Sequence, residues 1–143
     1  MVDNCEKLID NAYNLHVSGK YKEAKSLYED LLNLYPDNLD VMNLYAQLNF
    51  TLKDYDTALN LFLKIYEMTK LEDVIINIIK VYLQKKDYQK AIEYISIIKN
   101  KTEEIIRYEA QIYFALSDYD KAIDKYLKLI NSSNVLLNDM FNL

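Results

Sequence analysis

Apolar residues recur along the chain at helical spacing, and the same short pattern appears four times. In each copy a Tyr precedes an Ala by three positions, as in Tyr21 and Ala24, Tyr55 and Ala58, Tyr88 and Ala91, and Tyr119 and Ala122. Successive copies of the Ala are 34, 33 and 31 residues apart. A period of this length indicates a stack of similar units, each built from one supersecondary element.

The apolar positions around each Ala predict two helices per copy. Four and seven residues after the Ala come Tyr28 and Leu31, Phe62 and Ile65, Ile95 and Ile98, and Tyr126 and Leu129. Twelve and sixteen residues before it come Ala12 and Leu8, Ala46 and Met42, Ile79 and Ile75, and Ala110 and Ile106. Such steps of three and four keep side chains on one helix face. We therefore predict eight helices, over residues 3–17, 21–34, 38–51, 55–68, 72–84, 88–99, 103–115 and 119–131.

Small residues in both helices of a copy allow two antiparallel helices to pack closely. Ala12 and Ala24 are predicted to meet at such a crossing. Larger residues beside the crossing, among them the repeated tyrosines such as Tyr119 and Tyr126, are predicted to fill the core between one pair and the next. Asp37 or Asn38 is expected to cap the third helix, and Thr102 the seventh.

The repeats resemble the tetratricopeptide repeat family, whose unit of about 34 residues is a helix pair with small residues in both helices and often a terminal Pro. Pro36 occupies that terminal position. The chain departs from the pattern in lacking Trp, in having Ile79 at a small-residue position, and in a short last step, which we place in the loop 100–102. The resemblance implies an all-α, right-handed superhelical α-solenoid of antiparallel helix pairs. Its four repeats are expected at about residues 5–38, 39–71, 72–102 and 103–133.

Residues 134–143 contain apolar positions that fit one side of a short helix. We predict either a capping helix on the fourth pair or the opening of a fifth repeat. In the first case the segment is expected to pack on Tyr126 and Ile130, and docking into a neighbouring molecule is the alternative.

Composition narrows the function classes. The chain of 143 residues has 17 Lys and Arg against 22 Asp and Glu, a net charge of −5, and no basic cluster that would bind a phosphate backbone. Nucleic acid is therefore not expected as a partner. No apolar stretch reaches the roughly 20 residues of a membrane-spanning helix, and the first residues lack the pattern of a signal peptide. A cytoplasmic protein without membrane insertion is expected.

The residue types that carry most catalytic chemistry are scarce. His16 is the only His and Cys5 the only Cys, so neither a His-paired nucleophile nor a cluster of His and Cys metal ligands is expected. Gly19 is the only Gly, which argues against a phosphate-binding glycine loop. We expect no enzymatic activity, no metal and no cofactor.

The resemblance implies that the first helix of each repeat lines a concave face that holds a partner. When the four repeats are aligned on their Ala residues, the equivalent positions of the first helices carry apolar, aromatic and amide side chains and two cations. They are Ile9, Tyr13, Asn43, Gln47, Phe50, Ile76, Lys80, Leu83, Arg107, Gln111 and Phe114. Apolar anchors beside amides suit an extended or helical peptide. The competing interpretation is that some of these side chains belong to the core.

Some members of the family bind the carboxylate tails of chaperones through a clamp of Lys, Asn and Arg. The corresponding positions here are Ile9, Tyr13, Leu44, Asp73 and Asn77, so chaperone C-terminal tails are disfavoured. The favoured function is a protein-binding scaffold module. The alternative is a structural or self-associating N-terminal segment of a larger assembly subunit, so a homo-oligomer is one possible outcome.

Overall fold

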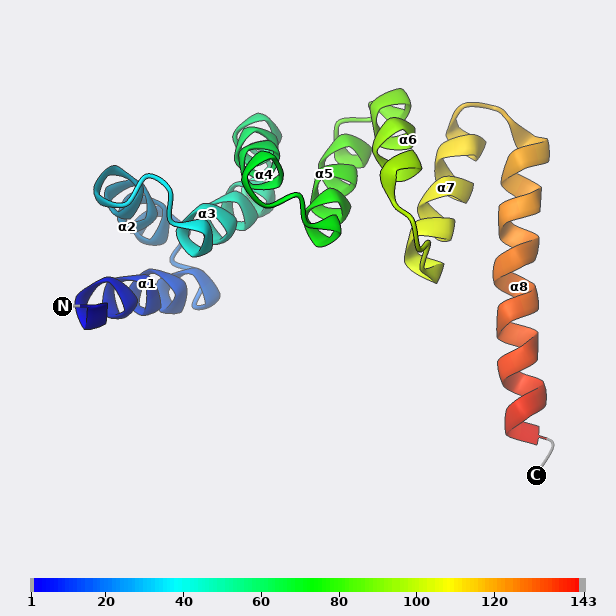
Figure 1. Ribbon diagram of the computed structural model, residues 1–143, viewed down its shortest axis with the longest axis horizontal. Helices are drawn as coiled ribbons and strands as arrows, with labels where there is room; N and C mark the ends of the chain where they lie inside the picture. The colour runs from blue at the N-terminus through cyan, green and yellow to red at the C-terminus, as the bar shows by residue number, and fades with distance from the viewer. Residues whose placement is uncertain (1, 142–143) are drawn as a thin grey trace. The chain divides into compact units, whose positions relative to one another are not determined.

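The computed structural model describes residues 2–141, with side chains described for residues 4–132, and Figure 1 shows its helices in chain order. They are α1 (Val2–Val17), α2 (Tyr21–Leu34), α3 (Leu39–Thr51), α4 (Tyr55–Thr69), α5 (Glu72–Gln84), α6 (Tyr88–Ile97), α7 (Glu103–Ala115) and α8 (Tyr119–Phe141). No strand occurs among residues 2–141. The predicted all-α helical repeat architecture is confirmed, and the bounds of α2, α5 and α7 are those expected from the sequence.

The chain divides into two compact units, Met1–Asn77 and Ile78–Leu143, with the division inside α5. In the first unit α1 packs on α2, α3 packs on α4, and α3 also contacts α2 and α1. In the second unit α7 packs on both α6 and α8. Each unit is thus held by contacts between helices that are close in sequence, as in repeat proteins generally.

The turn inside each helix pair has a left-handed residue at the same repeat position. These residues are Gly19, Lys53, Lys86 and Ser117, with φ of 80°, 63°, 59° and 62°. The amide of the following residue donates to a carbonyl five positions earlier, as from Asp54 to Asn49 at 2.8 Å and from Asp118 to Tyr113 at 2.8 Å. This hydrogen bond closes the end of the first helix and reverses the chain. Three of the four turns adopt this backbone without glycine.

Side-chain caps fix where several helices begin. Asn38 accepts a hydrogen bond from the amide of Val41 at 3.1 Å, and Thr102 accepts one from Ile105 at 3.4 Å. These two caps are as predicted. Asp54 and Asp87 cap the second helices of their pairs in the same way. Because each cap satisfies an amide that the helix leaves unpaired, it stabilises that helix start by about 1 kcal/mol.

The residues predicted at helix crossings are buried in every repeat. Their exposed fractions are 0% for Ala12, Ala24, Ala46, Ala58, Ile79, Ala91 and Ala110, and 2% for Ala122. Tyr28 and Leu31 pack with Val41 and Leu48 of the next pair in one core cluster. The repeat pattern in the sequence therefore identified residues of the core correctly.

Two features of the second unit differ from expectation. Helix α6 ends at Ile97, before the predicted residue 99, so the shortening of the repeat begins at the end of this helix. Helix α8 continues without a break to Phe141, where a separate short helix was expected from about residue 134. Side chains beyond Ser132 lie outside the described residues, and the packing of that segment on Tyr126 and Ile130 stays a prediction.

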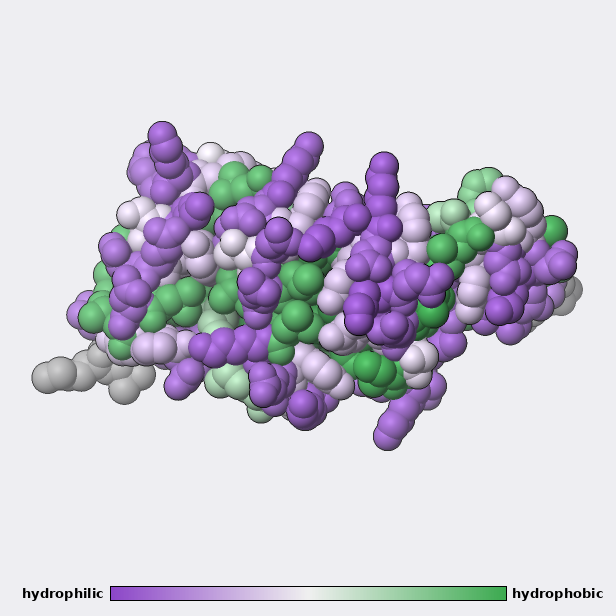
Figure 2. All heavy atoms as spheres, turned by 90° about the horizontal axis from the view of Figure 1, so that it is seen from above, coloured by the Kyte–Doolittle hydropathy of each residue, from purple (hydrophilic) through white to green (hydrophobic). Residues whose placement is uncertain are grey.

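The prediction that all the repeated tyrosines are core residues is wrong for the last pair. Tyr28 is fully buried, but Tyr119 is 54% exposed and Tyr126 is 39% exposed. The reason is that, among the described residues, no helix pair packs on this side of α8. Figure 2 shows apolar residues as green patches among the purple, hydrophilic ones.

Candidate protein-binding surface

Three residues predicted to bind a partner line one surface hollow on the first unit. The hollow has a volume of about 320 Å³ and is lined by Ile9, Asp10, Tyr13, Asp40, Asn43 and Leu44. The first three of these residues lie in α1, and the other three lie in the first half of α3. Tyr13 is 45% exposed, and Ile9 and Asn43 are half-buried. The first helices of two successive repeats thus form a shared surface at this point.

The charges at this hollow are negative. Asp10 and Asp40 are both exposed and flank the apolar side chains of Ile9 and Leu44. Sequence reasoning missed the two aspartates, although their positions on the first helices of neighbouring repeats could have revealed them. A carboxylate approaching this hollow meets two like charges, whereas a cation meets two opposite ones.

The other predicted residues of the first unit do not line this hollow. Gln47 is exposed on α3, and Ile76 on α5 is half-buried. Phe50 is also half-buried, and its ring packs edge-on against Tyr55 with 5.5 Å between ring centroids. Phe50 therefore contributes to the packing of its own helix pair as well as to the surface.

The predicted residues of the second unit differ in how strongly they are held. Lys80 lies 3.6 Å from the carboxylate of Glu104, and Leu83 is half-buried. Arg107 and Gln111 are exposed on α7. Phe114 is 61% exposed, although its ring also packs edge-on against Tyr119 at 5.5 Å. This makes Phe114 the most exposed aromatic side chain predicted for the surface.

An aromatic contact between the two helices recurs at one repeat position. His16 occupies in the first pair the place of Phe50 and Phe114, and its ring packs edge-on against Tyr21 at 6.0 Å. The Nδ1 atom of His16 is 3.2 Å from the hydroxyl of Tyr28. Burial lowers the pKa of His16. The ring thus acts as a packing residue, which agrees with a structural role for the only His.

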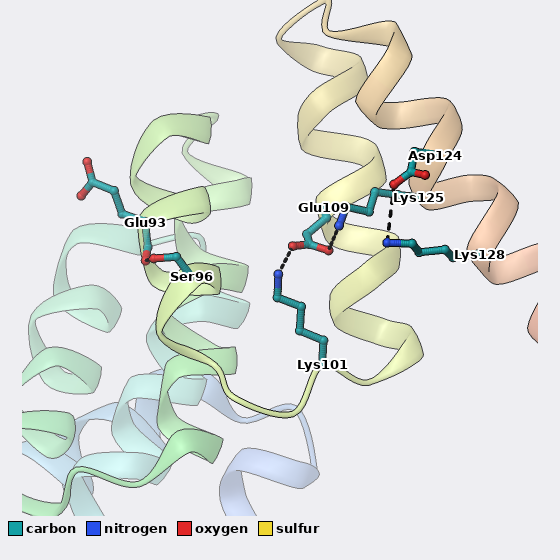
Figure 3. Close-up of polar contacts among 7 residues, drawn as sticks. All are labelled: Glu93, Ser96, Lys101, Glu109, Asp124, Lys125 and Lys128. Carbon is teal, nitrogen blue, oxygen red and sulfur yellow. Dashed lines mark hydrogen bonds and ion pairs between the residues drawn. The ribbon is translucent and has the colours of Figure 1, made fainter.

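A buried ion cluster holds the start of the fourth pair. Glu109 on α7 is 2% exposed, and its carboxylate pairs with Lys101 of the preceding loop and, at 3.2 Å, with Lys125 of α8 (Figure 3). The neighbouring pair of Asp124 and Lys128 is exposed. The sequence signal for the cluster is an acid directly before Ala110, where the second and third repeats have Tyr45 and Ile78.

Two features were searched for among the described residues: groups of metal-ligating side chains and helices long enough to span a membrane. Within the part of the chain that the structure describes, no group of three His, Cys, Asp or Glu side chains could hold a metal ion. Among the described residues, no helix has both the length and the apolar character needed to cross a membrane.

Comparisons with known proteins agree with this architecture. Residues 18–65 match the family described as Tetratricopeptide repeat. Comparison with curated protein sequences finds no match. Residues 18–65 span the first turn, α2, α3 and most of α4.

Solved structures with the same fold cover nearly the whole chain. MamA from Desulfovibrio magneticus RS-1 is 15% identical with a TM-score of 0.81, and 92% of this chain aligns with 76% of that one. MamA of MSR-1 is 17% identical with a TM-score of 0.80, covering 91% of this chain and 77% of that one. A tetratricopeptide repeat protein from Parabacteroides merdae ATCC 43184 is 19% identical with a TM-score of 0.83, and 92% of this chain covers 53% of it.

At these identities the structural matches define the fold, and the matched segment supplies the sequence evidence. Both point to the same repeat, with no individual member indicated. Residues 18–65 therefore match a tetratricopeptide repeat by sequence, and nearly the whole chain has the fold of solved structures that include a tetratricopeptide repeat protein.

Proposed function

We propose that this chain is a non-catalytic interaction module that binds a peptide or helical segment of a partner protein on the first helices of its repeats. The fold is one of protein-interaction scaffolds, whose repeats are typically non-catalytic. The observation that carries the proposal is the hollow between α1 and α3, lined by Ile9, Tyr13 and Asn43. These three residues were expected at the surface from register alone.

The chemistry of the hollow favours a particular kind of segment. Tyr13 and Ile9 provide apolar area, and the amide of Asn43 can both donate to and accept from a peptide backbone. Asp10 and Asp40 favour a Lys or Arg side chain whose alkyl part packs on the apolar residues. The preferred segment therefore has a cation next to an apolar residue, and acidic chaperone tails are disfavoured by the same two charges.

A displayed library of random peptides, selected on the purified chain, tests this proposal. Enriched peptides are then synthesised and titrated by fluorescence anisotropy. Tyr13→Ala is expected to weaken binding at least fivefold, or about 1 kcal/mol. Asp10→Asn combined with Asp40→Asn is expected to reduce the preference for basic peptides and the salt dependence of binding.

The matched control is Tyr35→Ala, because Tyr35 is similarly exposed, at 39%, but does not line the hollow. This variant is expected to bind like the unmodified chain. A library that yields no enriched peptides, or selected peptides that bind the Tyr13→Ala chain unchanged, would contradict the proposal. Phe50→Ala and Phe114→Ala extend the test to the other predicted anchors.

A further inference from the structure

Helix α8 carries a row of apolar side chains that are exposed. Their exposed fractions are 54% for Tyr119, 56% for Ile123, 39% for Tyr126, 53% for Leu127 and 53% for Ile130. We call these five residues the α8 stripe. Helix α8 packs on α7, Ala122 is 2% exposed, and Lys125 reaches the buried Glu109. Five apolar residues on one helix face differ from the single exposed residues of an ordinary surface.

The repeat register indicates that this face is shaped to receive a helix. Tyr126 is equivalent to Tyr28, Phe62 and Ile95, which are 0%, 2% and 1% exposed. Tyr28 is packed against Val41 and Leu48 of α3, the first helix of the next pair. Tyr126 has the same position on its pair, and it is 39% exposed with no helix covering it among the described residues, so another helix would fit there.

The other end of the repeat array does not offer a matching surface. In α3 the residues that face the preceding pair include Val41 and Leu48, which are both fully buried. The equivalent residues of α1 are Lys7 and Asn14, and both are exposed and polar. Because α1 presents an amide and a cation where an apolar face is required, head-to-tail stacking of copies is disfavoured.

We propose that the α8 stripe pairs with the α8 stripe of a second copy, with the two helices antiparallel about a twofold axis. Tyr119, Ile123, Tyr126 and Ile130 follow steps of four, three and four, which is the spacing of a coiled-coil seam. All five stripe residues are uncharged, so two identical stripes meet without repulsion between like charges. A twofold contact also closes at a dimer and leaves no free stripe.

The length of α8 supports this occupant. The helix has 23 residues, or roughly 35 Å at 1.5 Å per residue, and α7 has 13. The sequence continues the same spacing to Leu137 and Met140, although their side chains lie outside the described residues. If two α8 helices contact each other along this length, the surface area that each copy buries approaches the roughly 800 Å² per partner of a specific complex. The dimer does not depend on peptide binding by α1 and α3.

Sedimentation velocity of the full chain from about 1 to 200 µM tests the pairing. The unmodified chain is expected to show a concentration-dependent shift from monomer to dimer and no larger species. Ile123→Glu and Ile130→Glu each place a charge in the stripe at an exposed position and are expected to raise the dissociation constant at least tenfold. Circular dichroism melts check that both variants remain folded.

Lys121→Glu is the matched control, because Lys121 is exposed on α8, has a 63% exposed side chain and lies off the stripe. It is expected to dimerise like the unmodified chain. In a Cys5→Ser background, single cysteines at positions 123, 127 and 130 distinguish the arrangement, since a twofold pairing brings at least one of them against itself and yields a disulfide-linked dimer. A chain that is monomeric at every concentration, or folded stripe variants that dimerise normally, would overturn the proposal.

Discussion

The second and fourth helix pairs, α3–α4 and α7–α8, follow the same repeat pattern. They carry different types of side chain at one equivalent position. In α3 the residue before the small Ala46 is Tyr45, whose hydroxyl donates to Glu29 at 2.8 Å. In α7 the residue before Ala110 is Glu109, which pairs with Lys101 and Lys125. Burial, followed by the hydrogen bond to Glu29, raises the pKa of Tyr45 to about 12. The same place in the fold thus accepts an aromatic ring or a paired charge.

The two pairs also differ in what their second helices bury. Phe62 and Ile65 of α4 are 2% and 5% exposed, whereas Tyr126 of α8 is 39% exposed. The local sequence pattern is the same in both helices. The comparison shows that register decides which side of a helix is apolar, whereas burial of that side depends on whether another helix pair follows.

The largest expected effect concerns the equivalent positions Phe62 and Tyr126. Phe62→Ala removes a buried ring and is expected to lower the free energy of unfolding by about 3–5 kcal/mol. Tyr126→Ala is expected to lower it by less than about 1 kcal/mol in monomeric protein, because the ring is already partly in water. Urea unfolding at low protein concentration measures both. Equal losses would show that the α8 face is covered within the monomer.

Glu109 gives the next largest effect. Glu109→Ala leaves Lys125, whose side chain is 19% exposed, without its partner and is expected to cost about 3 kcal/mol in unfolding free energy. The control is Glu93→Ala, which breaks the exposed pair with Lys90 and is expected to cost much less than Glu109→Ala, because water screens an exposed ion pair. Similar losses in both variants would argue against a buried role for Glu109.

In the turns of the two pairs, substitutions are expected to have a smaller effect, and the effect is expected to be stabilising. Lys53 and Ser117 have left-handed backbones, with φ of 63° and 62°, and both are exposed. Lys53→Gly and Ser117→Gly are each expected to raise the free energy of unfolding by about 0.5–1 kcal/mol, because glycine adopts this backbone without a steric cost. Gly19→Ala should have the opposite sign, since no atom lies within 4 Å of the added Cβ and only the backbone opposes it. Thermal unfolding of the three variants measures the signs.

The smallest effect is a pH dependence from the first pair, where His16 replaces the Phe of the second and fourth pairs. Because burial lowers the pKa of folded His16, the unfolded chain binds this proton first as the pH falls through about 6.5. Stability is therefore expected to decrease as the pH falls from about 7 to 5. His16→Phe should flatten this slope in urea unfolding across that range. A slope that is unchanged in the variant would assign the proton uptake to other groups.

Much of the fold could be predicted because repeat register is a local property of the sequence. The Tyr and Ala pattern located the helix pairs, and Asn38 and Thr102 marked helix starts through chemistry that acts over three residues. The predicted surface residues Ile9, Tyr13 and Asn43 followed from the same register and line one hollow. Their role in binding stays a prediction, as does the handedness of the superhelix.

What the sequence determined by itself is which face of each helix is apolar, since that depends only on spacing along one helix. Only the tertiary structure decided which of those faces are buried, because burial needs a second element at the right place. Tyr28 and Tyr126 have the same local pattern, but among the described residues only Tyr28 is covered by a following helix pair. The partners of Glu109 were likewise set in three dimensions, where a loop lysine and an α8 lysine converge on one carboxylate. A charge can be buried there because those partners reach it, and no pattern within α7 specifies them.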